Sequence, residues 1–289
     1  MKKIQIRNLT DDVFERMEQS AAVNERSLEG EARFALRRHY FPDAALPETS
    51  MRDRWRQETG ARLAWLFDRL RDDEALGYRE PVDTARIARL SGEASPATLL
   101  ECLDGRDDLS FALADRLAAA FDADAGWILS GRGTPFPVEN IGNAYHAFFQ
   151  PEGTTGRFEV ELMRIAAGRC AGTLFCLRRD VETGHFRLGA VTGAFVLGPG
   201  MGGVGYGKLK NFLLFLKTRC GDMPLPAFDW TPAEDEEDFW GTFGQHHPQY
   251  FRQMTRRDPA RWLTQMLQGE DPAGWFKGWT SDLKEIAAS

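Results

Sequence analysis

The stretch Met1-Lys-Lys-Ile-Gln-Ile-Arg-Asn-Leu9 opens the chain with polar and apolar residues in alternation. Successive side chains of a β-strand point to opposite faces, so the pattern predicts a short strand with one apolar face and one polar, basic face. The apolar face carries Ile4 and Ile6. The opposite face carries Lys3, Gln5 and Arg7.

Two short helices are expected after this strand. Thr10 is a favourable N-cap, two aspartates follow it where the helix dipole favours acids, and the helix should end near Asn24, which tolerates left-handed backbone angles. Ser27 is expected to cap a second helix that continues to about Tyr40. The residues expected to face inward are Val13, Met17 and Ala21 on the first helix, and Leu28, Ala32 and Ala35 or Leu36 on the second.

One strand and two helices in about forty residues bury too little apolar surface to be stable alone, which predicts pairing with a second copy. Pairing of the two strands gives a two-stranded ribbon. Its outer face fits the major groove of DNA, where Arg and Gln side chains can read guanine and adenine edges.

Residues 1 to about 41 resemble the ribbon-helix-helix (Arc/MetJ-type) DNA-binding fold, and most of all its FitA-like antitoxin branch. The resemblance is carried by the runs Ile6-Arg-Asn-Leu-Thr10 and Arg26-Ser-Leu-Glu-Gly-Glu31. It implies that Lys3, Gln5 and Arg7 read bases. It also implies that the backbone amides of Ser27 and Leu28 hold a phosphate. Alternatively, the strand closes another sheet and its charges are simply solvated.

The composition is that of an ordinary globular protein with room for two or three domains, since 43% of the 289 residues are hydrophobic and 27% are charged. We find no apolar run of transmembrane or signal-peptide length, which predicts a cytoplasmic protein without a membrane partner. As a DNA-binding regulator it is expected to be bacterial and associated with the nucleoid when bound to DNA. Four cysteines without a C-x-x-C pair are expected to be reduced and mostly buried. No metal and no cofactor is expected.

The formal net charge of −7 is unevenly distributed along the chain. Residues 1–40 carry eight Lys or Arg against seven Asp or Glu, whereas residues 83–140 carry five against ten. Phosphate affinity depends on local charge, so the ribbon is expected to meet DNA and the middle of the chain is not.

Residues 51–137, which follow a proline-containing linker, are predicted to form an all-helical domain. Its expected helices span about 51–73, 84–90, 95–103, 110–121 and 126–129. Over about residues 60–135 this spacing resembles the Cro and lambda-repressor type of helix-turn-helix. The matching runs are Ile87-Ala-Arg-Leu-Ser-Gly92, Ser95-Pro-Ala-Thr-Leu-Leu-Glu-Cys-Leu-Asp-Gly105 and Leu117-Ala-Ala-Ala-Phe-Asp-Ala-Asp-Ala-Gly-Trp-Ile-Leu-Ser-Gly131.

Two departures make this helix-turn-helix degenerate. The turn has one extra residue near Glu93, and the helix that should enter the groove presents Pro96, Ala97, Leu100 and Glu101 in place of base-reading side chains. An acidic, apolar face does not favour phosphate or bases, so we expect packing or dimer contacts. The alternative keeps Thr98 and Arg106 as modest DNA contacts.

Residues 141–289 are predicted to form a third domain, an antiparallel sheet with helices. The expected elements are strands at about 157–165, 173–179 and 185–197, a hairpin turn at 182–184 and a helix at about 208–218. The chain as a whole is therefore expected to be α+β and multidomain. The third domain resembles no known family, and its expected role is oligomerisation or sensing of a small-molecule or protein partner.

The glycine-rich run from Gly198 to Lys208 matches two phosphate-binding patterns imperfectly, because Leu209 stands where a P-loop requires Ser or Thr. The candidate residues for an anion or ligand loop are Gly202, Gly203, Gly205, Gly207 and Lys208. A flexible loop is one alternative, and an anion at the start of the following helix, near Lys208 and Lys210, is another.

The C-terminal tail, which is rich in aromatic residues, is expected to be helical. Helix starts are predicted at Thr231-Pro-Ala-Glu234, Asp258-Pro259 and Asp271-Pro272. The adjacent His246 and His247 are expected in a loop, not as metal ligands, because neighbouring helical side chains point apart.

These features favour a DNA-binding transcriptional regulator of the repressor type that binds its operator as a homodimer or higher oligomer. An antitoxin that neutralises a toxin and regulates its own operon is the alternative, although FitA-like antitoxins usually carry only a short peptide where this chain has about 240 further residues. No nucleophile and base constellation, metal set or intact phosphate loop indicates an enzyme.

Overall fold

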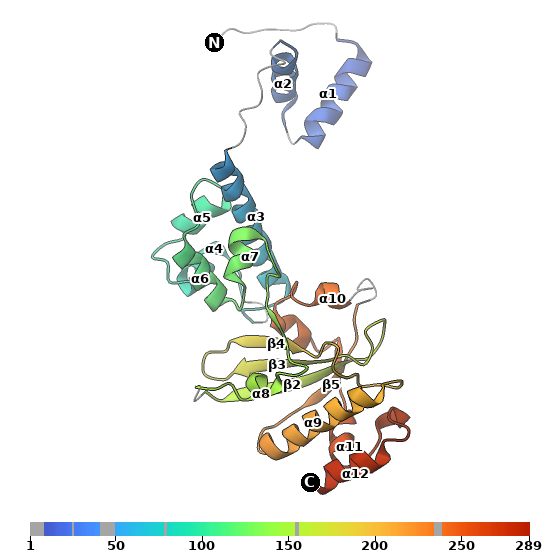
Figure 1. Ribbon diagram of the computed structural model, residues 1–289. Coiled ribbons are helices and arrows are strands. Elements are labelled where there is room, and N and C mark those ends of the chain that lie inside the picture. The colour runs from blue at the N-terminus through green and yellow to red at the C-terminus, as the bar shows by residue number, and fades with distance from the viewer. Residues whose placement is uncertain (1–8, 25, 41–49, 78–79, 154–155, 234–238) are drawn as a thin grey trace. The chain divides into compact units, whose positions relative to one another are not determined.

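The computed structural model describes residues 9–24, 26–40, 50–77, 80–153, 156–233 and 239–289 (Figure 1). The chain forms two compact units, Met1–Arg54 and Trp55–Ser289. The predicted domains at residues 51–137 and 141–289 stay a prediction. No helix in the described part is long and apolar enough to cross a membrane.

The first unit contains the two predicted helices, α1 (Asp11–Val23) and α2 (Leu28–Tyr40). Asn24 ends α1, but its φ of −97° is not left-handed, and its side-chain amide instead donates to the Ser20 carbonyl at 2.7 Å. The predicted strand lies almost wholly in residues 1–8, outside the described residues.

The inward face predicted for these helices is only partly covered. Ala21 is buried, whereas Val13 is 41% exposed and Ala35 is exposed. The remaining predicted positions are half-buried, namely Met17, Leu28, Ala32 and Leu36.

The second unit begins with a helical part that follows the prediction closely. Its helices are α3 (Met51–Asp72), which starts in the first unit, α4 (Thr84–Leu90), α5 (Ala97–Leu103), α6 (Phe111–Ala120) and α7 (Ala125–Ser130). Side chains of Asp83, Ser110 and Asp124 cap α4, α6 and α7 by accepting backbone amide hydrogen bonds. Leucines of α3 share one buried core with residues of α5 and α6.

Gly60 lets α3 approach the end of α5 closely. A Cβ at Gly60 would lie 2.7 Å from the carbonyl oxygens of both Cys102 and Leu103, which are backbone atoms and cannot turn away. Gly207, on the helix α9 (Gly203–Arg219), has open space around the same position.

We expect opposite effects when these two helical glycines are replaced. Gly60→Ala should lower the free energy of unfolding by about 1–3 kcal/mol through overpacking. Gly207→Ala should raise it by about 0.5–1 kcal/mol, because alanine is the better helix former. Urea unfolding of the full-length variants checks both values, and equal midpoints would contradict the close approach.

A six-stranded sheet organises the rest of the second unit, in the order β1-β4-β3-β2-β5-β6. The strands are β1 (Val138–Asn140), β2 (Phe158–Ile165), β3 (Leu174–Asp180), β4 (Phe186–Ala190), β5 (Ala227–Trp230) and β6 (Arg257–Pro259). The predicted antiparallel strands are the central β2, β3 and β4. The α+β class is therefore confirmed, but the sheet is mixed, because β1 pairs parallel with β4 and β5 parallel with β2.

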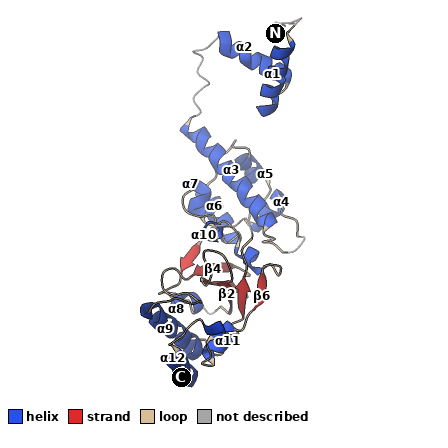
Figure 2. Ribbon diagram, turned by 90° about the vertical axis from the view of Figure 1, so that its right-hand side faces the viewer, coloured by secondary structure: helices blue, strands red, loops and turns tan. Residues whose placement is uncertain are grey.

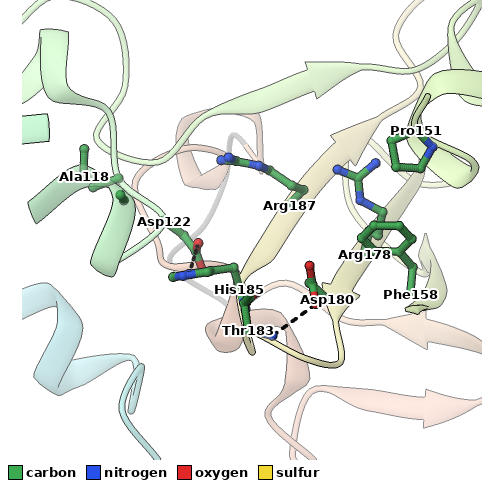
Figure 3. A pocket seen from close by; sticks show the side chains of 11 residues that line it. Ala118, Asp122, Pro151, Phe158, Arg178, Asp180, Thr183, His185 and Arg187 are labelled. Atoms are coloured by element: carbon green, nitrogen blue, oxygen red, sulfur yellow. Dashed lines mark hydrogen bonds and ion pairs between the residues drawn. The ribbon is translucent and has the colours of Figure 1, made fainter. Parts of the chain in front are cut away.

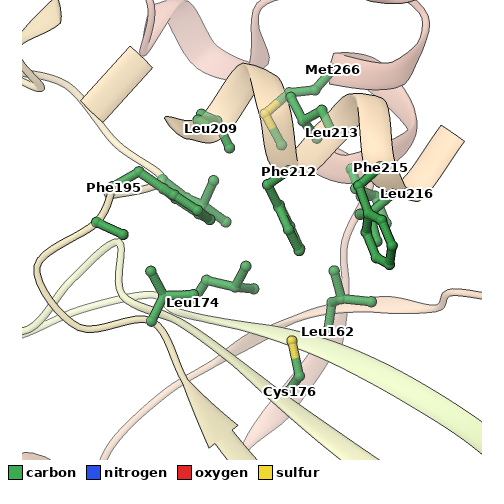
Figure 4. Packing of buried hydrophobic residues seen from close by; sticks show 14 of the residues in the cluster. Leu162, Leu174, Cys176, Phe195, Leu209, Phe212, Leu213, Phe215, Leu216 and Met266 are labelled. Atoms are coloured by element: carbon green, nitrogen blue, oxygen red, sulfur yellow. The ribbon is translucent and has the colours of Figure 1, made fainter. Parts of the chain in front are cut away.

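Helices cover one face of this sheet. They are α8 (Tyr145–Phe149), α9, α11 (Trp262–Leu267) and α12 (Thr280–Ala288), and Figure 2 shows α9, α11 and α12 on one side of the strands. Figure 4 shows Phe212 and Leu213 of α9 above Leu162, Leu174 and Cys176 of the sheet. The other face packs on η1 (Pro248–Arg252), where Phe251 contacts Phe175 and Trp230.

Several sequence predictions for this part are wrong in detail. The third strand ends at Ala190 rather than near residue 197, and α9 begins at Gly203 rather than Lys208. Burial of Leu209, Phe212 and Leu216 against the sheet outweighs the poor helix propensity of the glycines before them.

The tail also differs from its predicted helix starts. Residues 231–233 are not helical, and the described helix there is α10 (Phe239–Thr242). Asp258-Pro259 lies in β6. Because β6 is an edge strand, the sheet tolerates a proline there, although proline has no N–H to donate. Pro272 does start a short 3-10 helix, η2 (Pro272–Gly274), and the two histidines do lie in a loop.

Candidate nucleic-acid interface

The junction between α1 and α2 is held by the buried carboxylate of Glu31. Its Oε1 accepts from the Ser20 hydroxyl at 2.8 Å, and its Oε2 lies 3.4 Å from Nη1 of Arg26. The Arg26 guanidinium also lies 4.1 Å from the centre of the Phe34 ring. These contacts join the last turn of α1 to the first turn of α2, and so set the direction in which the start of α2 points.

The start of α2 has the predicted cap. The Ser27 hydroxyl accepts from the Gly30 amide at 3.1 Å, and the Ser27 carbonyl accepts from the Glu31 amide at 2.9 Å. The amides of Leu28 and Glu29 make no hydrogen bond to any described residue. Free amides at the positive end of a helix dipole suit a phosphate oxygen, which is the role predicted for Ser27 and Leu28.

Apolar side chains are exposed around the start of α1. Leu9 is 39% exposed, and Val13 and Phe14 are each 41% exposed. Ala21 is the one buried hydrophobic residue in the described part of this unit. Within its described residues, this unit therefore leaves part of its apolar surface uncovered.

The helix pair α1 and α2 lies in the part of the chain that matches a known protein family. Residues 3–40 match the family described as "Antitoxin FitA-like, ribbon-helix-helix". No curated protein and no solved structure matches the chain. The FitA-like segment indicates a DNA-binding function of antitoxin or transcriptional-regulator type.

The predicted base-reading residues of the FitA-like segment, Lys3, Gln5 and Arg7, lie outside the described residues. Their assignment therefore stays a prediction. Of the predicted interface, the structure describes Ser27 and Leu28 at the start of α2, and their phosphate-binding role also stays a prediction.

Three arginines of the helix-turn-helix-like part form ion pairs with carboxylates. Arg86 contacts Glu80 at 2.5 Å, and Arg116 pairs with Glu93. Arg106, the alternative DNA contact, pairs with Glu101 at 2.8 Å, and this hydrogen bond raises the pKa of its guanidinium. Cations already matched to carboxylates attract phosphate weakly, which favours the interpretation that this part does not bind DNA.

The glycine-rich candidates do not form a loop beyond Gly202. That residue is the N-cap of α9, and Gly203, Gly205, Gly207 and Lys208 belong to the helix itself. The neighbouring Lys210 binds Asp282 at 2.8 Å and Glu285 at 2.5 Å. No described group of three or more His, Cys, Asp or Glu residues is arranged to hold a metal ion.

A buried polar cluster was not predicted from the sequence. It connects the helical part of the second unit to the sheet through Asp73 and Asp122, which are 2% and 8% exposed. Asp73 accepts from the His247 amide at 2.7 Å and lies 2.7 Å from Nδ1 of His246. Asp122 accepts from the Phe186 amide at 2.8 Å. The partners are 173, 174 and 64 positions apart, so no local pattern reveals them.

Proposed function

We propose that the protein is a transcriptional repressor that binds an operator through a dimeric ribbon formed by its FitA-like segment. The match over residues 3–40 carries this proposal. The cap at Ser27 supports it, because it leaves helix amides free for a phosphate. In this proposal Lys3, Gln5 and Arg7 read base edges in the major groove, and the chain acts by binding without a catalytic step.

The proposed operator has two related half-sites, because a two-fold symmetric ribbon presents the same side chains twice. Selection of random-sequence duplexes by the full-length protein tests this directly. A short sequence that is enriched in two copies at fixed spacing is the expected result. Failure to enrich any sequence at low salt would contradict the proposal.

The full-length protein is expected to be at least a dimer at micromolar concentration. Phe14→Asp should shift it toward monomer, because it places a charge on the uncovered apolar face at the start of α1. Val23→Asp is the matched control, since Val23 is 83% exposed at the other end of the same helix. Sedimentation equilibrium measures all three proteins, and a wild-type monomer would contradict the prediction.

An antitoxin function is the second candidate, favoured by the description of the matching family. In that case the remaining chain would neutralise a toxin, while the ribbon would regulate the operon. A toxin encoded beside this protein, and its neutralisation on coexpression, would favour this second function over a repressor alone.

A further inference from the structure

A cavity of about 570 Å³ opens between the end of α6 and one face of the β3–β4 hairpin (Figure 3). Small side chains of α6, among them Ala118 and Ala119, line one side, and Phe158 and Pro151 line another. Its volume lies within the range of small-molecule sites, and its lining combines apolar groups with a few charged ones.

Two arginines lie opposite each other in the strand register of this hairpin. Arg178 of β3 and Arg187 of β4 are directly paired in the antiparallel register, so their side chains rise from the same face, and both line the cavity. Like charges placed directly opposite each other on paired strands are destabilising. Neither side chain forms an ion pair with any described residue.

Arg178 is held in place by neutral groups. Its Nη1 donates to the Phe148 carbonyl at 2.5 Å, and its guanidinium lies 5.2 Å from the centre of the Phe158 ring. Burial lowers the pKa of Arg178 and Arg187 lowers it further, while Glu139 and Asp180 act in the opposite direction. The guanidinium is therefore oriented in advance, at the cost of partial desolvation.

The two carboxylates that line the cavity are already engaged. Oδ1 of Asp180 accepts from the amides of Glu182 and Thr183 at 2.8 and 3.1 Å, which closes the hairpin turn. Asp122 accepts from the Phe186 amide and lies 2.9 Å from Nδ1 of His185. Neither carboxylate forms an ion pair with Arg178 or Arg187.

We propose that this cavity binds a small organic oxyanion, with its carboxylate or phosphate between Arg178 and Arg187 and its apolar part against Phe158. An anion placed there removes the repulsion across the hairpin and gains charge-assisted hydrogen bonds.

Thermal unfolding and calorimetric titration of the full-length protein test this site with four probes at matched ionic strength. Phenyl phosphate and benzoate distinguish the two oxyanions, inorganic phosphate lacks the apolar part, and benzyl alcohol lacks the charge. We expect phenyl phosphate or benzoate to raise the melting temperature more than inorganic phosphate does, and benzyl alcohol to leave it unchanged.

Arg187→Ala is the decisive variant, because Arg187 is exposed and its loss does not open the core. Its affinity for the bound probe should fall by about 10-fold or more, as expected for the loss of a charged hydrogen-bond donor. Arg132→Ala, an exposed arginine outside the cavity, and Arg7→Ala, on the predicted DNA-reading strand, should keep wild-type affinity.

Three outcomes would overturn the proposal. The first is that wild type binds none of the three oxyanions at millimolar concentration. The second is that Arg187→Ala binds the probe as well as wild type does. The third is a lower melting temperature of Arg187→Ala without any probe, because removal of an opposed like charge should leave the temperature unchanged or raise it.

Discussion

Replacement of Arg7 by alanine is expected to weaken binding of the full-length protein to its selected DNA site by at least about 30-fold. A bidentate contact from arginine to a base edge contributes about 1–3 kcal/mol, and a symmetric ribbon makes it twice. The fold should be unaffected, because Arg7 is expected on the solvent-facing side of the strand. Lys3→Ala and Gln5→Ala should also weaken DNA binding, but by less.

The helix-turn-helix-like part supplies the matched control. Combined alanine replacement of Arg86, Arg89 and Arg106 should leave DNA affinity and its salt dependence nearly unchanged, because Arg86 and Arg106 already pair with carboxylates. Fluorescence anisotropy over a series of salt concentrations measures both quantities. If the triple variant lost affinity while Arg7→Ala retained it, the roles assigned to the two parts would be reversed.

Asp122→Ala is expected to lower the free energy of unfolding of the second unit by about 2–4 kcal/mol. The Phe186 amide would lose its acceptor, and His185 would lose its contact with the carboxylate. A buried donor without a partner costs about 1–3 kcal/mol. Asp122 also has a φ of +53°, a conformation that alanine adopts less readily than aspartate or asparagine. Urea unfolding of the full-length protein provides the measurement.

Two variants control for this effect. Asp122→Asn keeps an oxygen for the Phe186 amide and tolerates the left-handed backbone, so it should recover much of the loss. Asp115→Ala removes an exposed carboxylate from α6, seven positions before Asp122, and should change stability by less than about 0.5 kcal/mol. If Asp115→Ala and Asp122→Ala lowered the free energy of unfolding equally, the buried hydrogen bonds of Asp122 would not account for the effect.

Local elements were largely predictable from the sequence. The cap at Ser27, the helix starts near residues 84 and 110 and the hairpin turn at 182–184 depend on neighbours within a few positions, and the structure has each of them near the expected residue. The strands predicted at 157–165 and 173–179 likewise lie within one residue of the observed ends of β2 and β3. These signals are strong because periodicity and capping are properties of short stretches of chain.

The shape of the sheet required the tertiary structure. The strands β1, β5 and β6 have three or four residues each, which is too few to show alternation in the sequence. They form by pairing with neighbouring strands of the sheet. α9 connects β4 to β5, which pairs with β2, so the parallel pairing depends on how α9 packs across the sheet.

The FitA-like segment could be predicted from residues 1–41 alone, because its strand pattern, caps and helix lengths are all local. The links around Asp73 and Asp122, and the opposition of Arg178 and Arg187, join residues that are far apart or on different strands. Only packing and strand register bring such groups together, because a contact between distant residues leaves no periodic trace in the sequence. The DNA-binding class therefore followed from the sequence, whereas the buried cluster and the anion site were decided by the tertiary structure.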